Sequence, residues 1–340
     1  VMHVPVETAR AASDEARRLA ADCLVPVGGG STTGLAKAIA LESGLPILAI
    51  PTTYAGSEMT PIYGLTDAGG KRTGRDRKVL PKTVIYDPSL TLDLPVALSV
   101  TSGINAIAHA AEGLYAPDRN PITDLLAEEG IRALAAGLPQ VRAAPTDLEA
   151  RGLCLYGAWL CGTVLGNVGM ALHHKLCHTL GGTFNLPHAQ THTCVLPHAL
   201  AYNANSAPGA MTRIARALGA RKAAAGIHDL AVRNGAVVAL RDLGLAQRDL
   251  DRAADLAVAS PYPNPRPVER GCPFDCGPCT QHEQTAMLPI VPITSACNLD
   301  CPICYTHNKN DGAYHMSEAE LRAILGHIAL RSKSYLEWDA

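Results

Sequence analysis

The chain has 340 residues and a formal net charge of −2, and apolar residues make up 47% of it. This length allows two or three domains with a sizeable core. The small net charge gives no electrostatic reason to expect nucleic acid or an anionic membrane as a partner. No signal peptide is visible, and the isolated cysteines sit in apolar contexts typical of reduced thiols, so a cytoplasmic location is expected.

The first part of the chain predicts alternating helices and strands. Residues 7–20 have a helical pattern, residues 24–27 form a short apolar strand, and residues 32–41 predict a second helix. The turn between this strand and the second helix consists of Gly28, Gly29, Gly30 and Ser31. Glycines at a helix N-terminus let backbone N–H groups approach a phosphate, although a plain turn without a ligand is the alternative.

Two further strands are expected at residues 45–50 and 83–86. The first of them ends in a segment that carries Thr52, Thr53 and Ser57. Hydroxyl groups at the carboxyl end of a strand, next to a glycine turn, suit the ligand crevice of an open α/β sheet. The basic segment 69–78 is either a solvated hairpin or a surface for a charged ligand.

From residue 97 onwards the composition predicts helices. Residues 146–149 read as a capping box that opens a long apolar helix. The uncharged run 153–172 is long enough to span a bilayer, but its glycines favour a buried core helix. Helical periodicity also covers residues 209–217 and 227–258. The expected fold class is therefore α/β followed by all-α, with an incomplete Rossmann-like nucleotide-binding domain at 1–96 and a helical domain at 97–270.

Histidines are concentrated in residues 162–198. This stretch holds six of the 13 histidines, namely His173, His174, His178, His188, His192 and His198. His174 and His178 are four residues apart and share one helix face. The following Thr-Leu-Gly-Gly is expected to break the helix. Such a cluster suits a metal site or a proton-handling site, and burial in a polar core is the alternative.

The glycine turn, the Pro-Thr-Thr segment and the paired histidines together resemble the iron-containing alcohol dehydrogenase and dehydroquinate synthase-like superfamily. The resemblance runs from residue 1 to about Arg270 and is strongest to the maleylacetate reductase branch. It implies that further strands and helices of the nucleotide fold precede Val1. It also implies NADH or NADPH as cofactor, a small dicarboxylate substrate and a homodimer. The cofactor-binding positions that it implies are Gly28, Gly29, Gly30, Ser31, Thr52, Thr53, Ser57, Lys71 and Leu90.

The resemblance also implies the catalytic positions. In metal-dependent members an aspartate and three histidines hold the ion, and the matching residues here are Asn105, His109, His174 and His188, with His178 as a further active-site histidine. Asn105 brings no negative charge, so it is a poorer ligand for a divalent cation than aspartate. Gly34 is a second departure, because many relatives have aspartate there. Both departures favour a reductase that works without a tightly held metal, and an iron- or zinc-dependent alcohol dehydrogenase is the alternative.

A cysteine-rich segment follows Arg270. Two C-x3-C-x2-C triads are present, one formed by Cys272, Cys276 and Cys279 and the other by Cys297, Cys301 and Cys304. The second resembles the cluster motif of radical S-adenosylmethionine enzymes, which implies a [4Fe–4S] cluster and S-adenosylmethionine. The first triad predicts a second cluster or zinc, with His282 as a further ligand. Because this segment is short and the pattern changes at Gly271, residues 271–340 are expected to be a fragment joined to a reductase, so an iron–sulfur module on a degenerate reductase is a third hypothesis.

Overall fold

The structure is a computed structural model that describes residues 4–67, 70–259, 262–270 and 286–287. Contacts between Cα atoms divide the chain into two compact units, the N-terminal unit (residues 1–169) and the C-terminal unit (residues 170–340). The predicted domain boundaries at 96/97 and 270/271 differ from this division and stay predictions.

The N-terminal unit begins with short strands and two helices. Its elements are β1 (Val4–Pro5), α1 (Val6–Arg18), β2 (Val27–Gly28), α2 (Gly30–Ser43), β3 (Leu48–Pro51), η1 (Ser57–Met59), β4 (Ile62–Asp67), β5 (Gly70–Arg75), η2 (Arg77–Val79), β6 (Thr83–Val84) and η3 (Pro88–Thr91). The strands β2, β3 and β6 form a parallel sheet in that order, with Val27 opposite Ile50. The predicted α/β pattern is confirmed, although the strands are shorter than expected.

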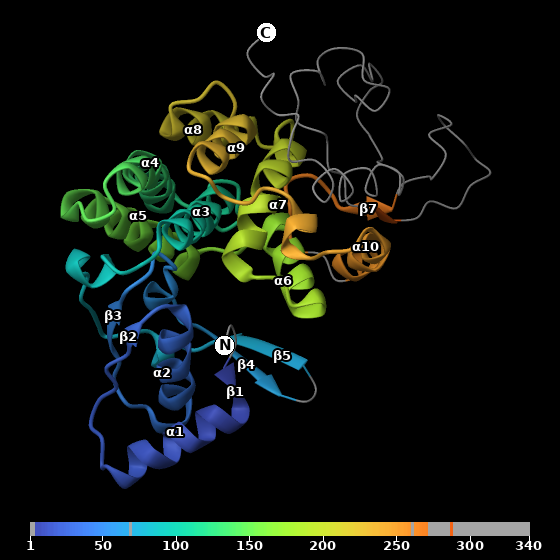
Figure 1. The fold of residues 1–340 in the computed structure, drawn as a ribbon. Helices are drawn as coiled ribbons and strands as arrows, with labels where there is room; N and C mark the ends of the chain where they lie inside the picture. The colour runs from blue at the N-terminus through green and yellow to red at the C-terminus, as the bar shows by residue number, and fades with distance from the viewer. Residues whose placement is uncertain (1–3, 68–69, 260–261, 271–285, 288–340) are drawn as a thin grey trace, which may run out of the picture. The chain divides into compact units, whose positions relative to one another are not determined.

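A second sheet joins β1, β4 and β5. The strands β4 and β5 pair antiparallel from Ile62–Arg75 to Asp67–Gly70, so the basic segment is a hairpin. Figure 1 shows this hairpin beside α2 and β1. The hairpin geometry is established by this pairing, whereas the question whether its basic side chains face solvent or a charged ligand stays open.

Three long helices complete the N-terminal unit: α3 (Val96–Gly113), α4 (Pro121–Ala143) and α5 (Leu148–Asn167) (Figure 1). They pack closely because small residues meet at the crossings. A Cβ atom on Gly157 would lie 3.0 Å from the Gly130 carbonyl oxygen, and one on Gly130 would lie 3.2 Å from the Gly157 oxygen. Glycine at both positions thus lets α4 and α5 approach each other backbone to backbone.

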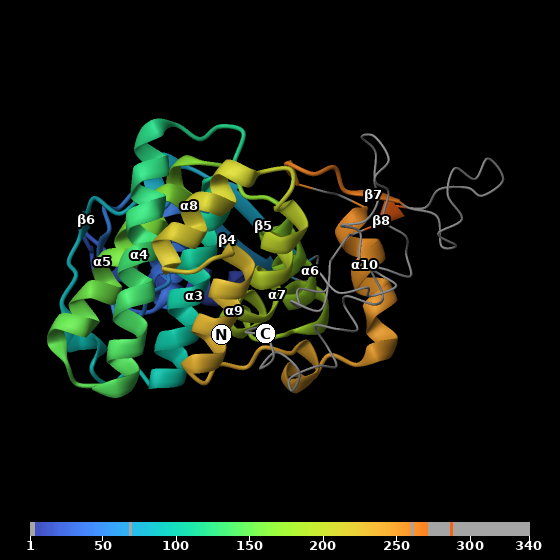
Figure 2. The ribbon, with the colours of Figure 1, turned by 90° about the horizontal axis from the view of Figure 1, so that it is seen from above.

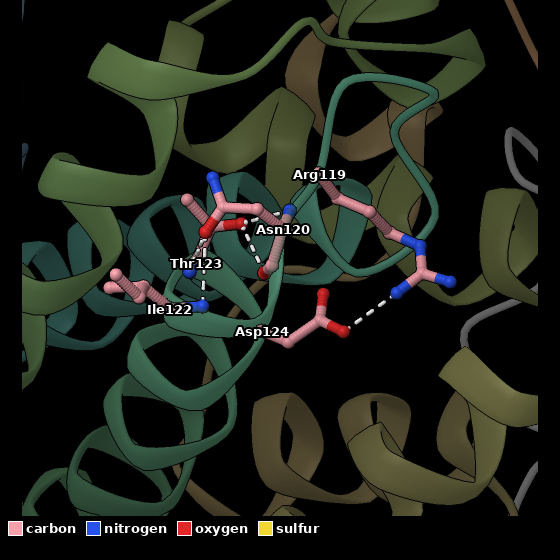
Figure 3. A network of polar contacts seen from close by, with 5 residues as sticks. All are labelled: Arg119, Asn120, Ile122, Thr123 and Asp124. Carbon is pink, nitrogen blue, oxygen red and sulfur yellow. Dashed lines mark hydrogen bonds and ion pairs between the residues drawn. The ribbon is translucent and has the colours of Figure 1, made fainter.

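The helix starts show how local residues fix the boundaries. Asn120 accepts hydrogen bonds from the backbone N–H groups of Ile122 and Thr123, and Thr123 Oγ1 accepts one from the Asn120 backbone, which completes a capping box at α4 (Figure 3). Arg119 forms an ion pair with Asp124 at 2.6 Å beside this cap. The predicted helix after residue 146 is confirmed as α5, but Asp147 is the cap residue.

The C-terminal unit is helical. It contains α6 (Leu172–Phe184), α7 (His188–Asn203), α8 (Pro208–Leu218), α9 (Ala223–Arg233), η4 (Leu240–Leu243), η5 (Gln247–Asp249) and α10 (Leu250–Val258), followed by the short strands β7 (Glu269–Arg270) and β8 (Ala286–Met287). Figure 2 shows α6, α7 and α9 as neighbours, with α10 next to α6. The core between them includes Leu172, Leu176, Val195 and Leu250.

Two expectations for this unit are corrected by the structure. The pair Gly181-Gly182 does not break α6, which continues to Phe184 and ends at Asn185 in the left-handed conformation, φ 54°. Glycine weakens a helix without necessarily ending it, and here the left-handed residue Asn185 ends it. The predicted helical region 227–258 is divided by the turns η4 and η5.

The lengths and apolarity of the described helices bear on a membrane location. Among the described residues, no single helix is both long and apolar enough to cross a bilayer, and only α5 and α6 taken together as a bent pair pass by length and composition. Ten residues of α5 are buried in the structure, in agreement with the expected core helix.

Candidate functional site

The glycine turn and the Pro-Thr-Thr segment lie side by side in the N-terminal unit. The backbone N–H of Thr52 donates to the Gly28 carbonyl oxygen at 3.0 Å. Gly28 has φ +154°, and a Cβ there would lie 2.5 Å from Thr32 Oγ1. A Cβ on Gly29 would lie 3.0 Å from Thr53 Cγ2. Glycine at position 28 is therefore favoured by its backbone conformation and by the close approach of Thr32, and at position 29 by the close approach of Thr53 alone.

The start of α2 is suited to an anion. Its N-cap is Gly29, which has no side chain to accept from the first backbone N–H groups of the helix. Those groups, together with the helix dipole, favour a negatively charged ligand. The chain's own residues thus fit the pyrophosphate of a nicotinamide cofactor, with Ser31 exposed and Thr32 partly buried at the first turn.

A buried lysine anchors the loop that follows β3. Lys37 on α2 is fully buried, and its Nζ donates to the carbonyl oxygens of Ser57, Thr60 and Ile62 at 2.6, 2.7 and 2.8 Å and to Thr60 Oγ1 at 2.9 Å. Desolvation lowers the pKa of Lys37 to about 7, against the attraction of Glu58. The segment that carries Ser57 is therefore tied to the helix that begins at the glycine turn.

Glu58 belongs to the same buried group. It is 2% exposed, and it accepts a hydrogen bond from the Tyr86 hydroxyl at 2.8 Å. Desolvation raises the pKa of Glu58, while the Tyr86 hydrogen bond and Lys37 act in the opposite direction. Lys37 and Glu58 were not among the predicted site residues, although a lysine inside the apolar run of α2 was a signal that it needs buried partners.

The remaining positions implied for the cofactor are less constrained. Lys71 lies on β5, where only its backbone is described, and Leu90 is an exposed residue of η3. Their roles, like that of Ser57, stay predictions.

The helix α3 carries two of the predicted catalytic residues. Asn105 and His109 are one turn apart, and both are 4% exposed. The buried Asn105 Oδ1 has no hydrogen-bond partner among the described residues. A bound molecule with a hydrogen-bond donor would supply the partner that this buried amide oxygen lacks among the described residues.

The other predicted catalytic residues form a cluster in the C-terminal unit, on α6 and α7. His174 is buried, whereas His178 and His188 are partly buried. The ring centroids of His174 and His178 are 6.1 Å apart. His178 Nδ1 lies 3.1 Å from the Tyr262 hydroxyl.

This cluster also contains His192, His173 and Tyr262, which were not among the predicted site residues. His192 lies between the rings of His174 and His188, with centroid distances of 4.9 and 4.3 Å. Its Nδ1 is 2.9 Å from His173 Nε2. Tyr262 comes from the segment after α10. The four-residue spacing of His188 and His192 was the available signal for one of these residues, whereas the approach of Tyr262 depends on tertiary structure.

The buried side chains of His173, Cys177 and His192 offer ligand atoms that lie within 4.8 Å of one another. Two nitrogens bound to one tetrahedral zinc ion are separated by about 3.4 Å, as follows from Zn–N bonds of about 2.1 Å. The 2.9 Å distance between His173 and His192 is instead that of a hydrogen bond. The geometry of this group therefore favours a shared proton over an ion.

Family models and known proteins match the chain over its first four-fifths. A model described as iron-containing alcohol dehydrogenase matches residues 1–88, and one described as Fe-containing alcohol dehydrogenase family, C-terminal, matches residues 99–271. A maleylacetate reductase from Burkholderia cepacia is 67% identical over 269 residues, covering 79% of this chain and 76% of that protein.

Solved structures of maleylacetate reductase and of a related reductase also match the chain. The crystal structure of maleylacetate reductase from Agrobacterium tumefaciens matches with a TM-score of 0.77 at 57% identity, covering 79% of this chain and 77% of that one. A sulfoacetaldehyde reductase from Bifidobacterium kashiwanohense in complex with NAD+ matches with a TM-score of 0.69 at 26% identity, covering 76% of this chain and 75% of that one.

The chain belongs to the iron-containing alcohol dehydrogenase family. Within this family it is an oxidoreductase that resembles maleylacetate reductases. The predicted fold class and the predicted nicotinamide dependence are confirmed at this level.

The family name implies iron, but the ligands that the resemblance implies here include no carboxylate. The acceptor on α3 that has no hydrogen-bond partner within the described part of the chain is the neutral amide of Asn105, and the other implied ligands are imidazoles. No carboxylate among these residues offsets the charge of the ion. No step of the reaction is therefore assigned to a metal.

The two cysteine triads, Cys272–Cys279 and Cys297–Cys304, lie outside the described residues. The family models end at residue 271 and give no support to the iron–sulfur or radical S-adenosylmethionine resemblance. Both remain predictions.

Proposed function

We propose that the chain catalyses the NAD(P)H-dependent reduction of maleylacetate to 3-oxoadipate in the degradation of aromatic compounds. The observation that carries this proposal is the 67% identity to a maleylacetate reductase over 269 residues. The two family models, over residues 1–88 and 99–271, include the glycine turn and the histidine helices respectively. The small dicarboxylate substrate and a homodimeric assembly are part of the same proposal.

The reaction is a conjugate reduction. The nicotinamide cofactor supplies a hydride to the alkene carbon next to the carboxylate. The electron pair of the double bond then moves towards the ketone, so negative charge develops on the ketone oxygen. Protonation of the remaining alkene carbon gives the saturated product. Without a metal, hydrogen-bond donors of the protein must stabilise the enolate oxygen.

The histidine cluster supplies donors of this kind. His174, which is buried, and His188, which is partly buried, are the proposed donors to the enolate oxygen, because imidazole N–H groups shielded from water stabilise charge more strongly than exposed ones. His178 is the proposed proton donor, since its ring is partly buried and its Nδ1 contacts the Tyr262 hydroxyl. The resemblance assigns Asn105 and His109 to the same reaction.

The cofactor is proposed to be held at the start of α2. The glycine turn and its neighbour Thr53 would hold the pyrophosphate, and the loop anchored by Lys37 would bring Ser57 towards the cofactor. The choice between NADH and NADPH depends on the adenosine end, which the glycine turn does not contact.

The direct test measures the loss of NADH or NADPH absorbance when maleylacetate is added to the purified full-length chain. Activity should persist in the presence of a chelator and should fall by at least about a hundredfold in His174→Ala. His228→Ala is a matched control, because His228 is also buried but lies on α9. A chain that binds no nicotinamide cofactor would disprove the proposal. Activity that is lost on chelation and restored by iron or zinc would instead favour the metal-dependent alcohol dehydrogenase.

A further inference from the structure

His192 occupies the centre of the histidine cluster. Its side chain is completely buried, and its ring lies 4.3 Å from that of His188, 4.7 Å from that of His173 and 4.9 Å from that of His174, measured between centroids. His188 and His192 are one turn apart on α7, whereas His173 and His174 lie on α6. The orientation of the His192 ring therefore constrains imidazoles on both helices.

His173 fixes that orientation. The 2.9 Å contact between His173 Nε2 and His192 Nδ1 joins two completely buried rings. In a pair of neutral imidazoles one nitrogen must donate and the other must accept, so the tautomers of the two rings are complementary. The bond also links α6 to α7 at the level of His174. A rotation of either ring would leave a buried polar atom without this partner.

We propose that His192, held by His173, is a positioning residue for the reductase reaction. It sets the ring planes of His174 and His188, which would act on the enolate oxygen. This inference rests on the proposed function for its catalytic consequence. The ring contacts on which the inference depends are present in the structure whatever reaction the protein catalyses. His192 itself donates nothing to the substrate in this account, and its effect passes through the two rings that it contacts.

The experiment compares two variants of the full-length chain at position 173. His173→Phe keeps a ring of similar volume but removes the hydrogen bond to His192. His173→Gln places an amide where imidazole Nε2 was, so it can retain the bond. The kcat for maleylacetate should fall by about ten- to a hundredfold in His173→Phe and recover in His173→Gln, because small misplacements of catalytic groups cost this much. The KM for NADH should stay within about twofold, since the cofactor residues are elsewhere.

A second measurement does not depend on activity. In the 15N spectrum of histidine-labelled protein, the ring nitrogens of His174, His188 and His192 should shift in His173→Phe and return towards wild type in His173→Gln. The control His228→Phe alters another buried histidine, on α9, and should leave these signals and kcat unchanged.

The outcomes distinguish a failure of the positioning role of His192 from a failure of the proposed reductase function. Wild-type kcat and unchanged signals of His174 and His188 in His173→Phe would overturn the positioning role. A wild-type chain that binds NADH but does not reduce maleylacetate would overturn the proposed function, while the spectra would still decide the role of His192. If His173→Phe does not fold, His192→Asn takes its place, because it keeps a polar atom opposite His173 and removes the ring. It should lower kcat, and a wild-type kcat would count against the proposal.

Discussion

The buried lysine of α2 makes a stability prediction that can be worked out from the structure. Lys37 is surrounded by oxygen atoms and has a pKa lowered from 10.5 to about 7 by desolvation. Between these values the unfolded chain binds a proton at this residue that the folded chain does not bind. The free energy of unfolding therefore rises with pH across this window, by about 1.4 kcal/mol per pH unit. The whole shift corresponds to about 5 kcal/mol.

Lys37→Met removes the titrating group and keeps a side chain of similar length. It also leaves the carbonyl oxygens of Ser57, Thr60 and Ile62 without their donor, which lowers stability by about 2–4 kcal/mol at pH 7. The difference in stability between wild type and variant should widen by about 2 kcal/mol as the pH rises from 7 to 9. Below about pH 6 the difference should be constant, because Lys37 is then protonated in both the folded and the unfolded state.

Guanidinium unfolding followed by circular dichroism, at pH values from 6 to 9, measures this difference. Lys78→Met, at an exposed lysine, gives the baseline for removing one surface charge. A difference between wild type and Lys37→Met that stays constant from pH 7 to 9 would refute the reasoning. It would mean that the oxygen atoms around Nζ stabilise the ammonium enough to offset its desolvation.

Four further predictions concern the glycines, the donor set and the cysteines. Gly28→Ala should weaken NADH binding by about tenfold, measured by fluorescence titration, because its φ and the space at its Cβ both disfavour a side chain; unchanged affinity would remove the glycine turn from the cofactor site. Gly162→Ala should lower the free energy of unfolding by about 1–3 kcal/mol, seen as a lower melting temperature, because its Cβ would lie 2.6 Å from the Gly56 backbone oxygen. Gly182→Ala is the control, because a Cβ at that position meets no atom within 4 Å and should not destabilise the protein by a clash. Asn105→Asp should raise the iron or zinc content per chain by about tenfold over wild type by elemental analysis, because it restores a charged ligand; equal content would show that the amide is not what limits metal binding. Cys301→Ser should reduce the iron content and visible absorbance of anaerobically reconstituted protein, and a wild-type chain that takes up no iron would end the cluster prediction.

Much of the fold could be predicted because its signals are local. The helix at residues 7–20 has a clear 3.6-residue periodicity and forms as α1, and the glycine turn stands between a strand and a helix as expected. The strands were predicted too long. Their ends depend on which backbone groups find a partner in the sheet, and β2 pairs with β3 only at Val27 and Gly28, apart from a bridge at Leu24.

The helix breaks were harder to predict for a related reason. The run from residue 153 to 172 has no charge and no proline, so nothing local shows that α5 ends at Asn167. The glycines at 181 and 182 look like a stop, but the α6 backbone tolerates them, and Asn185 ends the helix by adopting a left-handed conformation. A helix boundary of this kind is set by tertiary packing as much as by propensity.

The sequence by itself determined the family, the glycine turn and the histidine spacing, because residue types at fixed short separations carry those features. Only the tertiary structure decided which groups meet across elements. It placed Lys37 against the loop after β3, the His173 ring against His192, and the Tyr262 hydroxyl against His178. These contacts join residues that are 20, 19 and 84 positions apart in the chain. No local sequence pattern specifies such pairs. Burial of the surrounding apolar side chains brings the paired residues together, and their polar atoms must then form hydrogen bonds with each other inside the protein.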